Sequence, residues 1–126
     1  MAFKEYPDHI FVYGANEAGR HGAGAALWAT KNRGARNGKI KFYGQSYGIP
    51  TKDKWIMTLP LDKIKPYVDE FIEFAKEHPE LKFQITPIGC GLAGYKPEQI
   101  APMFKNVPNN CLLPEEFVEI LNDKSN

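Results

Sequence analysis

The chain has 126 residues, of which 43% are hydrophobic and 25% are charged, and its formal net charge is +1. These values predict one globular domain over residues 1–126, and the charge argues against a general affinity for nucleic acid or membranes. No apolar run approaches the roughly 20 residues of a membrane span, and the N-terminus lacks a signal peptide's apolar core. The two cysteines, Cys90 and Cys111, form no CxxC pair, so we expect a reduced, cytoplasmic setting.

Short apolar segments that favour strands alternate with segments that favour helices. The expected strands are His9–Tyr13, Ile40–Tyr43, Ser46–Pro50, Trp55–Leu59, Lys82–Ile88 and a short one within Val107–Leu113. The first expected helix is Ala25–Lys31, and the second has apolar residues at helical spacing from Ile64 to Ala75 and ends near His78. A third helix is expected to begin at Pro97 and to be limited by Pro102, and a fourth to begin at Pro114. The alternation predicts an α/β fold with a mostly parallel sheet and helices on both faces.

Glycine and proline define several expected boundaries. Gly14 is expected to end the first strand, and Gly34 to stop the first helix. Pro66 is expected in the first turn of its helix, where proline is tolerated. The sequence leaves open whether residues 40–50 form two short strands or one strand with a bulge at Gly44. Lys82–Ile88 is expected to be the central strand.

Two glycine-rich loops follow predicted strands. Tyr13–Ala26 (YGANEAGRHGAGAA) and Ile85–Tyr95 (ITPIGCGLAGY) each lead from a strand through glycines toward a helix. Such glycines let backbone N–H groups converge on one point, and a helix N-terminus favours an anion. The first loop has neither the GxGxxG spacing nor the GK[ST] of a P-loop, and a strand-to-helix turn without a ligand is the alternative. Together the loops predict one phosphate-containing ligand at the carboxyl ends of the strands.

Three further features each have a possible chemical role and a simpler structural explanation. His21 has the right pKa range for a general acid or base, or it is a loop histidine that bonds the backbone or a ligand. Cys90 is either a thiol activated by nearby N–H groups or a small apolar filler, and we favour the filler. Lys52 and Asp53 form either a lysine–carboxylate pair or a solvated turn. The histidines and cysteines show no metal-binding spacing, so we expect neither a metal nor a cofactor.

The two loops resemble those of the macrodomain superfamily, which binds ADP-ribose. IGCGLAGYKPEQI is similar to its second phosphate-binding loop, and GANEAGRHGAGAA to its first. The closest likeness is to the branch of terminal ADP-ribose protein glycohydrolase, in Gly22–Ala26 and Ile88–Leu92. The likeness extends from His9 to about Phe104, and TLPL and LPEEF are similar to segments of small bacterial or phage macro-like proteins. The resemblance implies a three-layer α/β/α macrodomain-like fold with a mostly parallel, mixed central sheet.

The resemblance also implies roles for individual residues. Asn16 would stand near the distal ribose, and Tyr95 would border the ribose or adenine. The branch has its catalytic aspartate where this chain has Ala93, and Lys52 or Lys54 is the candidate for its catalytic lysine. The residues expected to wrap the diphosphate and distal ribose are Gly22, Ala23, Gly24, Gly89, Cys90, Gly91, Leu92 and Gly94.

Three functions follow as hypotheses. The first is binding of ADP-ribose or a related nucleotide diphosphate, with no membrane partner and no strong nucleic-acid signal. The second is an ADP-ribosyl hydrolase that removes ADP-ribose from a modified macromolecule or acts on ADP-ribose phosphate. Its catalytic candidates would be Asn16, His21, Lys52 and Asp53. The third is a protein-interaction domain without a ligand, which would use the basic segment Lys31–Lys41, although we favour the interpretation of that segment as a solvated loop.

Overall fold

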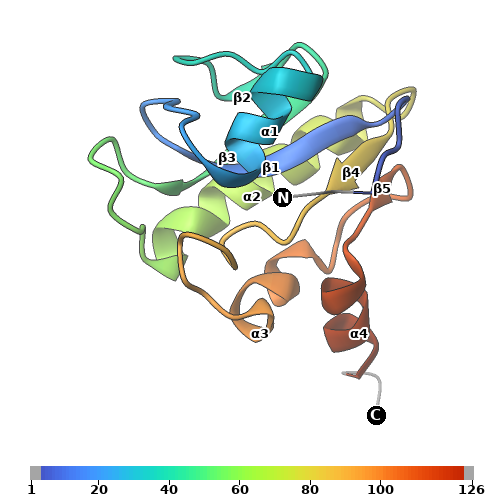
Figure 1. Cartoon of the computed structure of the whole chain (residues 1–126). Helices are drawn as coiled ribbons and strands as arrows, with labels where there is room; N and C mark the ends of the chain where they lie inside the picture. The colour runs from blue at the N-terminus through green and yellow to red at the C-terminus, as the bar shows by residue number, and fades with distance from the viewer. Residues whose placement is uncertain (1–3, 124–126) are drawn as a thin grey trace.

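The computed structural model describes residues 4–123 (Figure 1). Its strands form one sheet in the order β2-β3-β1-β4-β5, in which only the β2–β3 pair is antiparallel. The strands are β1 (Ile10–Asn16), β2 (Lys41–Tyr43), β3 (Ser46–Lys52), β4 (Phe83–Ile85) and β5 (Cys111–Leu112). The helices are α1 (Gly24–Asn32), α2 (Leu61–Glu77), α3 (Pro97–Ile100), the 3-10 helix η1 (Ala101–Phe104) and α4 (Glu115–Asp123).

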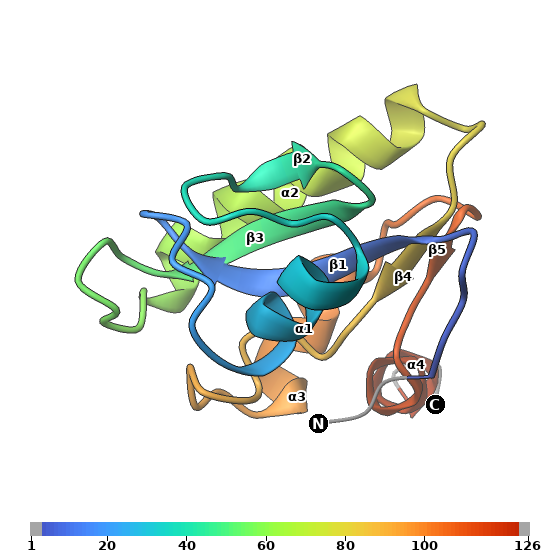
Figure 2. The ribbon, with the colours of Figure 1, turned by 45° about the horizontal axis from the view of Figure 1, so that its top comes forward.

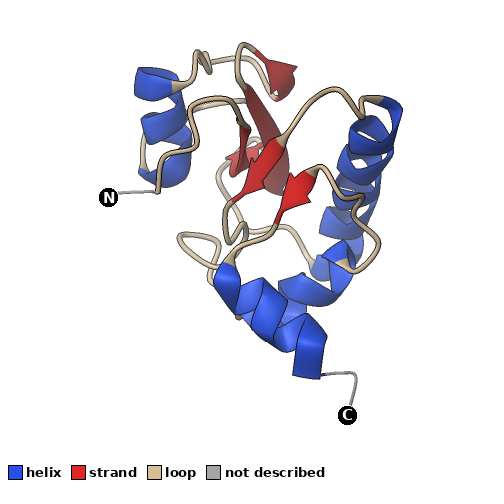
Figure 3. Ribbon diagram, turned by 90° about the vertical axis from the view of Figure 1, so that its right-hand side faces the viewer, coloured by secondary structure: helices blue, strands red, loops and turns tan. Residues whose placement is uncertain are grey.

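Helices cover both faces of the sheet. Figure 2 shows α1 in front of β1 and α2 behind the sheet, and Figure 3 shows the sheet between the two helices. Side chains alternate along β1, so that Phe11 and Tyr13 pack with α1 whereas Val12 packs with α2. The predicted α/β class, with a mostly parallel mixed sheet, is confirmed, and the arrangement is compatible with three layers. None of the helices within residues 4–123 has the length and apolar character needed to cross a bilayer.

The first strand runs further than predicted. β1 continues to Asn16 because Gly14 and Ala15 still pair with Ile49 and Pro50 of β3. Gly14 therefore does not end the strand. A Cβ at Gly14 would lie 3.6 Å from the backbone nitrogen of Gly89, so glycine lets the chain after β4 approach β1 closely.

The prediction that Lys82–Ile88 is the central strand is wrong in place and in extent. β1 is central, and β4 lies between β1 and β5. The Thr86 N–H still donates to the Val12 carbonyl at 3.1 Å. Pro87 has no N–H to continue the ladder, so the chain leaves the sheet there and turns at Gly89.

The segment Trp55–Leu59 is a loop and not the predicted strand. Its one ladder contact is an isolated bridge between Thr58 and Lys52. The Asp53 carboxylate accepts the backbone N–H groups of Trp55 and Met57 at 2.9 and 3.0 Å, which holds the chain in a turn. This local side-chain bonding competes with a strand ladder despite the apolar composition.

The clearest predicted helix starts earlier than expected. α2 begins at Leu61 and ends at Glu77, with His78 as its C-cap, so the predicted end near His78 is confirmed. Pro66 consequently lies inside the helix and not in its first turn. The helix buries Ile64, Val68, Phe71, Ile72 and Ala75, which are the residues whose spacing predicted it.

The remaining element predictions are confirmed within one or a few residues. Residues 41–52 form two antiparallel strands, with Gly44 at φ +60° in the turn. Arg33 caps α1, and Gly34 follows in the left-handed region at φ +74°. The helix at Pro97 changes to the 3-10 helix before Pro102. The last strand and helix, β5 and α4, lie within the predicted segments.

Candidate functional site

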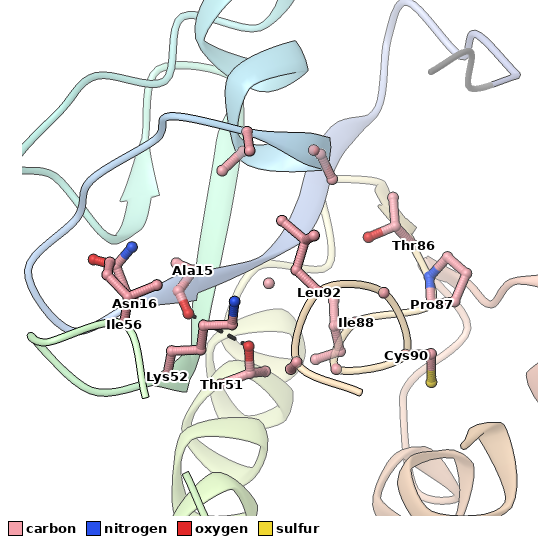
Figure 4. Close-up of a pocket in the computed structure, with 18 of the residues that line it drawn as sticks. Ala15, Asn16, Thr51, Lys52, Ile56, Thr86, Pro87, Ile88, Cys90 and Leu92 are labelled. Carbon is pink, nitrogen blue, oxygen red and sulfur yellow. Dashed lines mark hydrogen bonds between the residues drawn. The ribbon is translucent and has the colours of Figure 1, made fainter. Parts of the chain in front are cut away.

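A cavity of about 520 Å³ opens where β1, β3 and β4 end. Its walls include the first loop (residues 17–23, between β1 and α1) and the second loop (residues 86–96, between β4 and α3). Figure 4 shows Asn16, Thr51 and Lys52 on one side of the cavity, and Pro87 and Cys90 on the other. This is the edge at which ligands bind in open α/β sheets, and the volume is that of a small-molecule site.

Both loops line the cavity with residues whose backbone N–H groups have no acceptor in the described part of the chain. Within residues 4–123, no protein acceptor takes the N–H groups of Gly22, Ala23 and Gly24 from the first loop and the start of α1. The same holds for four residues of the second loop, Gly89, Gly91, Leu92 and Ala93. These donors are left to water or a ligand. Converging free N–H groups form a concave site suited to an anion.

The first turn of α1 adds to this anion site. Its N-cap is Ala23, which makes no side-chain cap, and its first turn contains no acidic residue. Ser, Thr, Asp or Asn would normally occupy the N-cap and satisfy an orphan N–H. An uncapped helix N-terminus carries a partial positive charge and free donors, which favours a phosphate.

The second loop is held in place from outside the cavity. The Thr58 hydroxyl donates to the Ala93 carbonyl at 3.0 Å, and the Tyr95 hydroxyl donates to the Leu59 carbonyl at 2.6 Å. Gly89 has φ +75°, and a Cβ there would lie 3.1 Å from a methyl carbon of Ile100. These contacts fix the loop's shape without using the N–H groups that line the cavity.

The two loops also approach each other. A Cβ at Gly24, where φ is +59°, would lie 3.6 Å from Leu92 Cδ1. Leu92 is 71% exposed, and Figure 4 shows it between the two sides of the cavity. A ligand held by both loops would therefore contact this apolar side chain.

Two cations line the cavity near the end of β3. Lys52 pairs in register with Asn16 of β1, and it is half-buried. Arg20 of the first loop is exposed. Neither side chain forms an ion pair within the described part of the chain, so both charges are available to an anionic ligand.

Asn16 lines the cavity, but its amide group shapes the first loop. Its Nδ2 donates to the Arg20 carbonyl at 2.8 Å, and its Oδ1 accepts the Arg20 N–H at 3.0 Å. The residue is 7% exposed. The paired bonds place Arg20 at the rim and leave one N–H of the amide for a ligand.

Four of the predicted site residues lie outside the cavity lining. His21 is 2% exposed, and its Nε2 lies 3.0 Å from the Lys39 carbonyl and 3.3 Å from the Tyr13 hydroxyl. Asp53 is engaged in the turn that precedes α2. The Gly94 N–H donates to the Gly91 carbonyl, and the Tyr95 hydroxyl donates to the Leu59 carbonyl, so the Tyr95 side chain does not border the cavity as predicted. Acid–base chemistry by His21 or Asp53 thus has no support from their positions.

The remaining predicted residues come together around the cavity. They are Asn16, Gly22, Ala23, Gly24, Lys52, Gly89, Cys90, Gly91 and Leu92. Burial, with the negative charges of Glu116 and Glu98, raises the pKa of the Cys90 thiol to about 11. Cys90 is therefore protonated at neutral pH, in agreement with an apolar filler and not an activated thiol.

Several lining residues were not found from the sequence. Thr51 is the next-to-last residue of β3, and Thr86 directly follows β4; their hydroxyls donate to the Ala15 and Val12 carbonyls. Ile56 comes from Trp55–Leu59, which the composition predicts as a strand but which forms a loop. Glu116 comes from α4, far along the chain, and no local motif marked it. Within residues 4–123 no group of His, Cys, Asp and Glu side chains could hold a metal ion.

Comparisons with known proteins give no relative for this chain. No protein-family model matches it, and neither a curated protein nor a solved structure does. A functional assignment therefore depends on the cavity, its two loops and the charges around them.

Proposed function

We propose that the protein binds ADP-ribose or a related nucleotide diphosphate in the cavity between the two loops. The observation that carries this proposal is the set of free N–H groups contributed from both sides, by Gly22–Gly24 and by Gly89 and Gly91–Ala93. The two loops are far apart in the sequence, yet they face one space. A diphosphate has two anionic groups, which matches two opposed sets of donors.

The charges near the cavity support the same ligand class. Lys52 and Arg20 can neutralise phosphate charge, and the uncapped N-terminus of α1 adds a favourable dipole. The apolar side chains of Ile88 and Leu92 offer surface to a ribose or a base. The resemblance of both loops to macrodomain loops adds support, and on that ground we propose a macrodomain-like fold.

The position of the carboxylates favours binding over hydrolysis. Ala93 stands where the glycohydrolase branch has its catalytic aspartate. Asp53 is outside the cavity, and Glu17, which follows Asn16, directs its carboxylate to the Tyr67 hydroxyl. Among the described residues that line the cavity, the one carboxylate is that of Glu116, which acts on Cys90 on the opposite side from Lys52 (Figure 4), so Lys52 has no carboxylate beside it. A lysine without such a partner can hold an anion but lacks the base that would activate water.

Calorimetric titration and thermal denaturation with ADP-ribose test the proposal. A ligand at 100 times its Kd stabilises the folded state by about 2.7 kcal/mol, which corresponds to a rise in Tm of about 10 °C for a domain of this size. Adenosine and ribose 5-phosphate are the controls, because neither carries a diphosphate. Absence of both heat and a Tm shift at millimolar ADP-ribose would refute the proposal.

The hydrolase alternative has a separate test. The assay follows two reactions over time, with wild-type protein and with Lys52→Ala. One is the release of ADP-ribose from an ADP-ribosylated protein, and the other is the release of phosphate from ADP-ribose 1″-phosphate. We expect no turnover with either protein and weaker ADP-ribose binding by the variant. Turnover by the wild type that Lys52→Ala abolishes would replace binding with hydrolysis as the function.

The interaction-domain alternative receives little support from the basic segment Lys31–Lys41. Arg33 is buried, lies 4.9 Å from the Trp28 ring and faces Glu5 at 3.6 Å. Lys41 pairs with Glu70 at 2.9 Å, and Lys39 lies over the Tyr43 ring. Much of the charge in this segment is thus used within the fold.

A further inference from the structure

The charges that line the cavity are unevenly distributed. Its cations, Lys52 and Arg20, lie with Asn16 at the end formed by β1 and β3. The one carboxylate among the described residues that line the cavity is that of Glu116, which belongs to the first turn of α4 and lies close enough to Cys90 to act on that thiol electrostatically. Figure 4 shows Cys90 on the opposite side of the cavity from Lys52 and Asn16.

The Glu116 carboxylate, near the Cys90 side of the cavity, has no cationic partner among the described residues. Glu116 forms no ion pair there and is exposed. A second carboxylate, Glu98 of α3, also acts on Cys90. The hydroxyl of Thr86 at this end is already bonded to the Val12 carbonyl. A ligand group beside Glu116 therefore meets a negative charge, whereas the free N–H groups of Gly89 and Gly91, which flank Cys90 in the chain, remain donors to the diphosphate.

We propose that Glu116 is a specificity-determining residue: it accepts hydrogen bonds from hydroxyl or amine groups at one end of the ligand and excludes a phosphate from that end. The inference rests on the proposed function, because it concerns the same ligand. The Lys52 end, with two cations and the amide of Asn16, accepts a phosphate. The cavity thus orients its ligand by charge and discriminates against a phosphate at one of the ligand's two ends.

The same physical principle lets dinucleotide-binding proteins distinguish NAD from NADP, which carries an additional phosphate on one ribose. A carboxylate beside a ribose accepts hydrogen bonds from its hydroxyls and repels a phosphate attached to the same sugar. Specificity of this kind comes from a repulsive element against the wrong ligand as well as from attraction to the right one. Because Glu116 is exposed, solvent weakens the repulsion, and we expect a discrimination of about tenfold and not of several orders of magnitude.

A role in helix stability is the competing explanation for an acidic residue at this position. Glu115 and Glu116 both lie in the first turn of α4, where negative charge stabilises the helix dipole. Glu115 does not line the cavity. Glu115→Gln therefore removes the same helix contribution as Glu116→Gln without changing the charge of the site, which makes it a matched control.

The test is a calorimetric titration of wild type, Glu116→Gln and Glu115→Gln with ADP-ribose, ADP-ribose 2′-phosphate and ADP-ribose 1″-phosphate. These ligands carry the additional phosphate at opposite ends. For wild type we expect one of the two phosphorylated ligands to bind about tenfold more weakly than ADP-ribose and the other to bind at least as well. Glu116→Gln should recover most of the loss, and Glu115→Gln should recover none.

Three results would overturn the inference while leaving the proposed function intact. They are equal weakening by both phosphates, weakening by neither, and a preference that Glu116→Gln leaves unchanged. Failure of ADP-ribose itself to bind wild-type protein would instead refute the proposed function, so the two failures are distinguishable. Repeating the titrations at higher salt should reduce the discrimination by wild type, because an exposed charge is screened.

Discussion

Replacement of Gly91 by glutamate tests whether phosphates lie against the second loop. Gly91 lines the cavity, its φ lies outside the left-handed region, and a Cβ there would meet no atom within 4 Å. The backbone therefore accepts a side chain at this position without strain. Glutamate brings a negative charge to the free N–H groups of residues 91–93.

The expected loss of affinity follows from the charge. Two like charges about 4 Å apart repel by about 4 kcal/mol at an effective dielectric constant near 20, and by about 1 kcal/mol in water. Gly91 is exposed, so we expect about 2 kcal/mol, which is about a 30-fold rise in the Kd for ADP-ribose. Gly91→Gln has nearly the same volume without the charge, and Gly91→Ala adds only a methyl group.

Calorimetry on the three variants separates charge from volume. Gly91→Glu should bind at least tenfold more weakly than Gly91→Gln, and Gly91→Ala should bind like wild type. The Tm values without ligand should agree within a few degrees, because the position is unstrained. Equal affinities for the glutamate and glutamine variants would show that no phosphate lies near Gly91, and the site would have to be assigned elsewhere.

Three further predictions concern residues around the cavity. Ile56 has φ +67°, so Ile56→Asn should be about 1 kcal/mol more stable than Ile56→Ala in urea denaturation, since asparagine tolerates this conformation. Tyr95→Phe should lose about 1 kcal/mol of stability with the bond to Leu59, yet keep wild-type affinity for ADP-ribose; a large loss of affinity would place Tyr95 at the ligand. In a Cys111→Ser background, alkylation of Cys90 should be slow at pH 8 and rise toward pH 11, and ADP-ribose should slow it. Because the pKa of the folded thiol exceeds its ordinary value of 9.0, stability should fall as pH rises from there to about 11.

Local sequence signals predicted most of the elements. The apolar spacing from Ile64 to Ala75 identified α2, because helix periodicity is written into neighbouring residues. The same is true of the glycine that follows α1 and of the proline that begins α3. Where prediction failed, at Trp55–Leu59, the composition favoured a strand, but the Asp53 carboxylate and the absence of a continuous partner strand produced a loop.

The candidate site, too, could be predicted from the sequence only in part. The two glycine loops could be identified from their own residues, since a strand, a glycine turn and a helix are consecutive in the chain. The direction of each polar side chain could not. Lys52 faces the cavity whereas Asp53, its neighbour, bonds the turn, and His21 is buried beside Tyr13 and not turned toward a ligand.

Most of the elements and the positions of the two glycine loops could thus be predicted from the sequence, because they depend on contacts between residues close along the chain. The central place of β1, the pairing of Lys52 with Asn16, and the position of Glu116 of α4 in the same cavity near Cys90 are visible only in the folded chain. These results depend on strand order and helix packing, which join residues tens of positions apart. No local pattern encodes such contacts, and they create the charge asymmetry from which the ligand preference is inferred.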